Sequence, residues 1–201
     1  MPSETFERFL SQLRATGSIK GDGFDRSHFD GLGWDERPMV GTLLQDALVA
    51  GDSTAAAGLV LLDRASAPEA LREALDQIPF ENGAGANAAG ELWLLTRDPR
   101  YQAELTRYLS HPGAGTPMVA LSYLSQTPPA PSLAPTLADF LLREADPRRR
   151  SIAAGLYLHW LGEIPNPDDS YRLRRPFMEA IKSPDPGTRR AALRQVNAAV
   201  A

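Results

Sequence analysis

The chain has 201 residues, of which 43% are hydrophobic and 23% are charged, and its net charge is −4. This composition fits one folded domain or a short repeat array, and it argues against a disordered chain. Because cysteine is absent, disulfides, thiolate nucleophiles and cysteine-ligated metals are excluded. The N-terminus lacks the apolar core of a secretory signal, and no window has the ~18 apolar residues of a membrane span. We therefore expect a cytoplasmic protein without a membrane partner.

The charge is unevenly distributed along the chain. Residues 1–140 contain 10 basic and 18 acidic residues, a net charge of −8, whereas residues 141–201 contain 11 and 7, a net charge of +4. Such asymmetry orients a charged partner during encounter. A nucleic-acid partner is disfavoured, because it needs a strongly basic face. Only two of the 21 basic residues are lysine, a bias typical of GC-rich bacterial genomes.

The first expected element is a helix over residues 5–15, followed by a polar connector over residues 17–36. The connector carries six residues that titrate or ligate cations: Asp22, Asp25, His28, Asp30, Asp35 and Glu36. Their spacing matches no calcium loop, and the three histidines of the chain lie in different units, so we expect no metal site. We expect the aromatic residues Phe24, Phe29 and Trp34 to hold the connector against the first repeat. Its acidic residues suit contact with a basic protein.

Five alanines mark an internal repeat downstream of the connector. These alanines are Ala56, Ala88, Ala120, Ala153 and Ala192. They are separated by 32, 32, 33 and 39 residues, and each is followed four positions later by a larger, mostly apolar residue. An i, i+4 pair lies on one face of a helix. Upstream of each alanine, a second apolar-periodic segment ends at a Gly- or Pro-containing break, where a helix stops. The sequence thus predicts five helix–turn–helix units over residues 37–201.

The turns of the repeat carry a recurring motif. Asp52, Asp146 and Asp185 stand where caps of the second helices belong. The last two copies share Asp-Pro-x-x-Arg-x-x-Ala, in which Arg150 and Arg189 occupy the arginine position. This motif resembles the inter-helix turn of HEAT repeats, including the bacterial HEAT-like type.

The resemblance covers about residues 37–201, although the first three copies lack the arginine. It implies an all-α fold, a right-handed α-solenoid of about five helix pairs preceded by the helix and loop of residues 1–36. It also implies that the aspartates and arginines link neighbouring turns, and that the second helices line the concave side.

The second helices present small residues two positions after each anchoring alanine and larger ones five positions after it. The larger apolar residues are Leu61, Trp93 and Leu158. Either neighbouring helices bury them, or they form an apolar strip that contacts a partner, with Trp93 as its main anchor. Together with the connector, the candidate partner-binding residues are Asp25, Asp30, Trp34, Asp35, Glu36, Leu61, Trp93 and Leu158.

Two further motifs have simpler interpretations. Gly83-x-Gly85-x-x-Ala88 matches a dinucleotide fingerprint, but that fingerprint needs a preceding strand, so we interpret it as a turn of the repeat. The C-terminal arginines suit either phosphate contact or a structural ladder through Arg150 and Arg189. No cofactor is expected.

A helical repeat without a convergent catalytic group predicts a non-enzymatic protein-binding module. The resemblance favours a bacterial immunity protein of a toxin–antitoxin type, whose acidic loop covers the basic active site of a toxin. Two alternatives stay open. One is a general interaction scaffold. The other is an enzyme that resembles the HEAT-like alkylpurine DNA glycosylases, with Trp93 and Trp160 stacked on a nucleotide; HEAT-like chromophore lyases share the fold as well.

Overall fold

The computed structural model describes residues 2–113 and 115–200. This part of the chain consists of α-helices, short 3-10 helices and connecting turns, and it contains no strand, so the all-α prediction is confirmed. The chain divides into two compact units, Met1–Tyr101 and Gln102–Ala201.

The first unit begins with a helix, α1 (Glu4–Arg14), close to the predicted bounds. The Ser3 hydroxyl accepts a hydrogen bond from the Phe6 backbone N–H and so caps the helix. The predicted connector is partly helical, because it contains α2 (Gly17–Gly21) and the 3-10 helix η1 (Arg26–His28).

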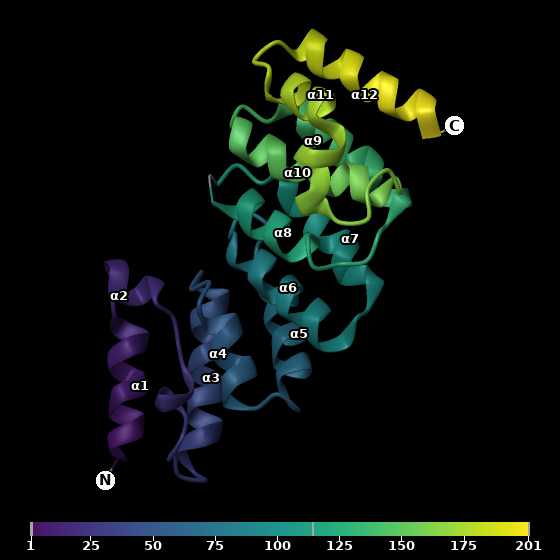
Figure 1. The fold of residues 1–201 in the computed structure, drawn as a ribbon. Coiled ribbons are helices and arrows are strands. Elements are labelled where there is room, and N and C mark those ends of the chain that lie inside the picture. Colours follow the sequence, from purple (N-terminus) through teal and green to yellow (C-terminus); the bar gives the residue numbers. More distant parts are fainter. Residues whose placement is uncertain (1, 114, 201) are drawn as a thin grey trace. The chain divides into compact units, whose positions relative to one another are not determined.

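The first unit contains four repeat helices. They are α3 (Glu36–Val49), α4 (Ala55–Leu62), α5 (Ala67–Gln77) and α6 (Ala84–Thr96) (Figure 1). Consecutive helices pair, α3 with α4 and α5 with α6, while α3 also contacts α5 and α4 contacts α6. The two helix pairs therefore stack on one another.

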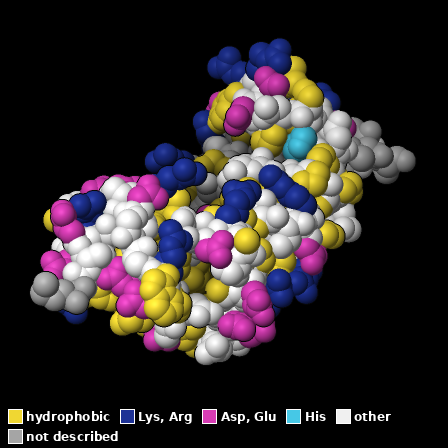
Figure 2. Space-filling view, turned by 90° about the horizontal axis from the view of Figure 1, so that it is seen from below, with side chains coloured by type: hydrophobic (Ala, Val, Ile, Leu, Met, Phe, Trp, Pro, Cys, Tyr) yellow, Lys and Arg dark blue, Asp and Glu magenta, His cyan; other side chains and the backbone are white. Residues whose placement is uncertain are grey.

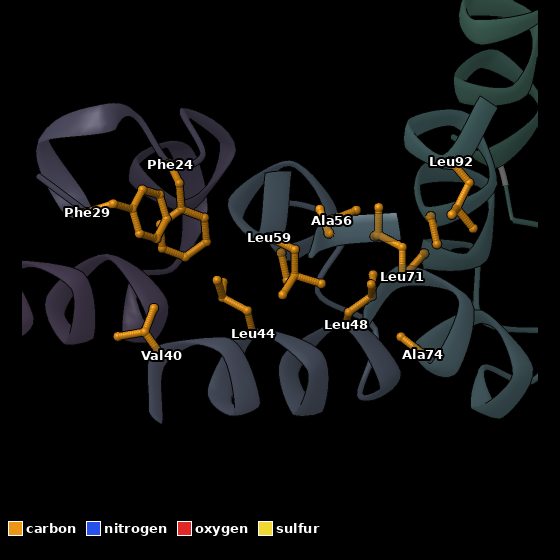
Figure 3. Packing of buried hydrophobic residues seen from close by; sticks show 14 of the residues in the cluster. Phe24, Phe29, Val40, Leu44, Leu48, Ala56, Leu59, Leu71, Ala74 and Leu92 are labelled. Atoms are coloured by element: carbon orange, nitrogen blue, oxygen red, sulfur yellow. The ribbon is translucent and has the colours of Figure 1, made fainter. Parts of the chain in front are cut away.

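One core connects the N-terminal segment to these helices. Phe9 lies 5.6 Å from Phe24 and 6.1 Å from Phe29 between ring centroids, and all three rings belong to the same buried cluster as the repeat helices. Figure 3 shows the side chains in a continuous row from the two connector rings past Val40 to Leu92 in α6. Residues 1–36 thus share their core with the first repeats.

The second unit contains the remaining helices of the repeat. They are α7 (Pro99–Arg107), which begins at the unit boundary, α8 (Thr116–Leu124), α9 (Ala134–Arg143), α10 (Pro147–Trp160), α11 (Ser170–Lys182) and α12 (Pro186–Val200). Three 3-10 helices stand between them: η2 (Tyr108–Ser110), η3 (Pro131–Leu133) and η4 (Pro167–Asp169). Helices are present in all ten predicted places, and contacts pair α9 with α10 and α11 with α12. The five anchoring alanines are buried.

The turns between paired helices share one hydrogen bond made by different residue types. In each turn a side chain accepts the backbone N–H two residues further on, which satisfies a donor that a helix start leaves unpaired. The five bonds run from the Thr54 N–H to Asp52, from the Ala84 N–H to Asn82, from the Gly113 N–H to His111, from the Arg148 N–H to Asp146, and from the Gly187 N–H to Asp185. Their lengths are 2.8–3.1 Å. The predicted caps Asp146 and Asp185 are present, whereas Asp52 lies two residues before Thr54, the N-cap residue of α4. An asparagine and a histidine make the same bond in the other two turns.

The two ladder arginines join helix ends in the second unit. Arg150 donates to the carbonyls of Glu144 and Ala145 after α9, and to those of Ile181 and Lys182 at the end of α11, at 2.6–2.9 Å. Burial and the nearby charge of Arg189 lower the pKa of the Arg150 guanidinium.

Arg189 bonds the carbonyls of Ser183 and Pro184 in its own turn and reaches back to Leu142 in α9. The arginines therefore link neighbouring turns as expected, whereas Asp146 and Asp185 cap their own helices.

Candidate functional site

The connector places some of its candidate residues in solvent and others in the interior of the protein. Asp25, Asp30 and Asp35 are exposed, and Trp34 is 88% exposed. Glu36 is buried, with an exposed fraction of 9%. Among the candidate partner-binding residues, three carboxylates and one indole of the connector therefore face solvent.

Trp34 stands at the tip of a tight turn. The Glu36 N–H donates to the Gly33 carbonyl at 3.2 Å, and the Gly33 N–H donates to the Glu36 carboxylate at 2.9 Å. These two bonds make Trp34 and Asp35 the central residues of the turn, and central turn residues face outward. The prediction that Phe24 and Phe29 pack against the first repeat is confirmed, but it is wrong for Trp34, which the turn directs away from the core.

Glu36 acts inside the protein rather than on its surface. Its carboxylate accepts hydrogen bonds from the Ser3 N–H and the Ser3 hydroxyl, both at 2.7 Å, besides the one from Gly33. The bonds from Ser3 and Gly33 hold the pKa of Glu36 below its usual value. Its assignment as a partner contact is thus corrected, because Glu36 fastens the Trp34 turn to the start of α1.

Asp25 is exposed but engaged locally. It accepts hydrogen bonds from the Ser27 N–H and hydroxyl at 2.7 and 2.6 Å, and these lower its pKa. Its carboxylate also lies 3.1 Å from His28 Nδ1. The Asp25 carboxylate therefore caps the short helix η1.

Asp30 and Asp35 are exposed carboxylates of the segment that carries Trp34, and Asp35 follows it directly. The Thr5 hydroxyl donates to the Asp30 carbonyl at 3.0 Å, so the backbone there is anchored to α1. Within residues 2–113 and 115–200, neither carboxylate takes part in an ion pair. Both charges therefore face solvent uncompensated.

An apolar residue that sequence reasoning missed extends this surface. Met39 is 55% exposed and, with Pro2, Phe6 and Asp35, lines a hollow of about 260 Å³. We define the Trp34 surface as Asp30, Trp34, Asp35 and Met39. The sequence could have indicated that Met39 is exposed. The buried residues Val40, Leu44 and Leu48 of α3 are spaced four apart, and position 39 does not lie on that buried face.

The predicted apolar strip on the second helices is not an exposed surface. Trp93 is 3% exposed, with the Arg97 guanidinium 4.2 Å from its ring centroid, and Leu158 is fully buried. Leu61 is half-buried. The assignments of Trp93 and Leu158 are corrected, because α6 contacts both α4 and α5, and α10 contacts α8, α9 and α11. Helices with neighbours on several sides bury residues all round their circumference. The assignment of Leu61 stays a prediction.

The buried tryptophans also bear on the glycosylase alternative. Trp160, like Trp93, lies in the core. Neither ring is available to stack on a nucleotide, so the observation that favoured this alternative no longer stands. The glycine motif likewise follows a helix, since α5 precedes it and Gly83 caps α6. The turn is confirmed for Gly83, whereas Gly85 and Ala88 lie inside α6.

Charges of both signs are spread over the protein surface. Figure 2 shows one face, on which basic, acidic and apolar side chains are interspersed. By unit, Met1–Tyr101 carries 9 basic and 16 acidic residues, a net charge of −7, and Gln102–Ala201 carries 12 and 9, a net charge of +3. The Trp34 surface belongs to the acidic unit.

No family model, curated protein or solved structure matches the chain. In the described ranges, no helix has the length and apolarity needed to cross a bilayer. Nor do three His, Asp or Glu side chains gather there as metal ligands.

Proposed function

We propose that this chain is a non-enzymatic protein-binding module that contacts its partner through the Trp34 surface. The observation that carries the proposal is the indole of Trp34, 88% exposed at the tip of a hydrogen-bonded turn. Covering a large aromatic side chain removes apolar surface from water, and tryptophan is among the residues most enriched in binding hot spots.

The turn is organised before any partner arrives. Its base is fastened by the bonds from Ser3 and Gly33 to Glu36, and the rings of Phe24 and Phe29 anchor the connector in the core. A preformed loop loses little conformational entropy on binding, so more of the contact energy appears as affinity. This order supports a recognition role for the turn.

The charges next to Trp34 indicate the chemistry of the partner. Asp30 and Asp35 are exposed carboxylates in a unit with a net charge of −7. They favour a cationic protein surface that offers an apolar pocket to the indole, and they steer its approach. An immunity protein that covers the basic active site of a toxin belongs to this class of module.

The scaffold that carries the surface is, on this proposal, a right-handed α-solenoid of the HEAT-like type. Its support is the stacking of consecutive helix pairs within a unit and the carbonyl links made by Arg150 and Arg189. One helix pair cannot bury its apolar faces alone, whereas stacked pairs share a continuous core.

The test compares Trp34→Ala with Ile19→Ala, a matched control that removes another exposed apolar side chain (62% exposed). With the partner identified by capture on the wild-type protein, we expect Trp34→Ala to weaken binding about 30-fold or more, the effect of losing about 2 kcal/mol. The change should lie in the dissociation rate measured by surface plasmon resonance. Equal affinities of the wild type and Trp34→Ala for the partner would contradict the proposal.

The charge component has its own readout in the same experiment. The double variant Asp30→Asn/Asp35→Asn should slow association and flatten its dependence on salt, because exposed charges mainly act during encounter. An unchanged salt dependence would show that the partner surface is not cationic.

A further inference from the structure

The segments around the inter-helix turns change charge along the repeat. Taken from eleven to two positions before each anchoring alanine, these segments are residues 45–54, 77–86, 109–118, 142–151 and 181–190. Their net charges are −2, −1, 0, +2 and +2. The last two segments together carry +4, which exceeds the net charge of +3 of the whole second unit. The positive charge of this unit is thus concentrated around its last two inter-helix turns.

These two turns are held side by side by hydrogen bonds. Arg150 in α10 donates to the carbonyls of Ile181 and Lys182, where α11 ends, at 2.9 and 2.6 Å. Arg189 in α12 donates to the carbonyl of Leu142, one residue before the end of α9, at 2.7 Å. The ends of α9 and α11 and the starts of α10 and α12 therefore lie at one edge of the second unit.

The two buried guanidinium groups leave their charge uncompensated at this edge. Arg150 is 3% exposed and Arg189 is 5% exposed. In the described ranges neither belongs to an ion pair with a carboxylate, and the Arg189 Nε donor is buried without a hydrogen-bond partner. Carbonyl dipoles satisfy donors but carry no net charge, so two positive charges remain there.

Four exposed cations lie around the same helix ends. We define the basic surface as these four residues: Arg143 at the end of α9, Arg148 at the start of α10, Lys182 at the end of α11 and Arg190 near the start of α12. Among the residues that the structure describes, no carboxylate forms an ion pair with any of them. The basic surface thus faces solvent with its charge unpaired.

The acidic residues of the two segments are engaged within the fold. Glu144 pairs with Arg149, with the Glu144 carboxylate 3.0 Å from Arg149 Nε. Asp146 caps α10 by accepting the Arg148 N–H, and Asp185 accepts the Gly187 N–H at the start of α12. These carboxylates therefore do not neutralise the basic surface.

We propose that the basic surface binds an acidic segment of a partner protein, whose carboxylates pair with the exposed cations. Arginine suits this contact, because its planar guanidinium group donates two parallel hydrogen bonds to one carboxylate. A bound anion also relieves the mutual repulsion of the gathered cations. The inference goes beyond the proposed function, because it adds a second contact surface, of opposite charge, in the other unit.

Two observations favour an acidic peptide over a nucleic acid. The chain as a whole has a net charge of −4, which repels a long polyanion more than a short acidic segment. Single-stranded nucleic acids also stack their bases on exposed aromatic side chains. Of the large apolar side chains exposed in the described ranges, only Leu173 belongs to the second unit, and it is not aromatic.

Fluorescence anisotropy with a labelled octaglutamate peptide tests the inference in the full chain. The double variant Arg148→Gln/Arg190→Gln removes two charges of the basic surface. Arg64→Gln/Arg72→Gln is the matched control, because it removes two exposed arginines of the first unit and leaves the same net charge. We expect the first variant to bind the peptide about fivefold more weakly, the effect of losing two exposed ion pairs. The control should bind like the wild type, whose binding should weaken with added salt.

The result that would overturn the inference is an absence of peptide binding at low salt, or an equal loss of binding in the two double variants. Tighter binding of an eight-nucleotide oligothymidylate than of the peptide would also overturn it, because the surface would then suit a nucleic acid. Trp34→Ala should bind the peptide like the wild type, since Trp34 belongs to the first unit. The proposed function is tested with the partner of the Trp34 surface, so it stands if only the peptide experiment fails.

Discussion

Arg150 illustrates how a single side chain can join two helix pairs. The last four carbonyls of a helix have no partner within it, and they form its negative end. Arg150 donates to such carbonyls after α9 and at the end of α11. Its buried charge is thereby balanced by dipoles of two helices, which a planar guanidinium can reach at once.

Replacing Arg150 by lysine should therefore be costly although the charge is kept. An ammonium group is a point donor and does not span both helix ends, so buried carbonyls lose their partners. We expect Arg150→Lys to lower the free energy of unfolding by about 2–4 kcal/mol, measured by urea denaturation. Arg148→Lys, at an exposed position, should change it by less than about 0.5 kcal/mol. Equal midpoints for the two variants would show that the link adds no stability.

At the scale of the element, α10 depends on a close approach at Gly155. A Cβ added there would lie 2.7 Å from the Pro167 carbonyl oxygen and 3.2 Å from the Ser170 hydroxyl. The nearer atom belongs to the backbone at the start of η4, which cannot move aside as a side chain can. The missing side chain thus lets α10 pack directly against the entry to α11.

In the substitution Gly155→Ala, helix propensity and packing have opposite effects on the stability of the protein. Propensity alone favours alanine by about 1 kcal/mol, but the backbone clash should dominate and destabilise the protein by about 1–3 kcal/mol. Gly21→Ala is the control, because a Cβ added at Gly21 would have no other atom within 4 Å; it should be neutral or slightly stabilising. Thermal unfolding followed by circular dichroism measures both. A stabilised Gly155→Ala variant would show that the two elements can separate freely.

The elements were predictable because their signal is local. Ala88 and Leu92 lie four residues apart, and such a pair fixes a helix and its buried side without knowledge of the rest of the chain. The prediction of an exposed apolar strip through Trp93 and Leu158 was wrong for the same reason. Local periodicity identifies one buried face, whereas the number of neighbours around a helix is set by the tertiary structure.

The candidate site was less predictable, since it depends on contacts between distant residues. Phe24, Phe29 and Trp34 are all aromatic residues of one connector, yet only the first two pack in the core. Their difference follows from Glu36, which bonds Ser3, 33 residues away, and closes the turn. No local pattern in the sequence indicates that bond, so the same partner-binding role was predicted for Asp35 and Glu36.

At the scale of the whole molecule, two compact units contain the repeat. Within each unit a helix contacts mainly helices one or two places away in the chain, so a local defect weakens local structure first. Ala88 and Ala153 are both fully buried, one in each unit. They allow this expectation to be tested with the same substitution in two places.

Ala88→Leu and Ala153→Leu should each destabilise the protein by about 1–3 kcal/mol, because neither site has room for added methylene groups. Hydrogen exchange followed by mass spectrometry should show faster exchange in α5 and α6 for the first variant, and in α9–α11 for the second. Faster exchange throughout the chain in both variants would instead show a single cooperative structure.

Because the five turns share one hydrogen bond, the charge of the side chain that accepts it can differ from turn to turn. Aspartate, asparagine and histidine all present an acceptor to the same N–H in Asp52, Asn82 and His111. A formal charge of −1 can therefore become neutral while the hydrogen bond of the turn is kept, although at Asp52 the ion pair with Lys20 is then lost. Each of these turns can thus acquire a new electrostatic character by a single substitution, so binding preference can diverge while the fold is inherited unchanged.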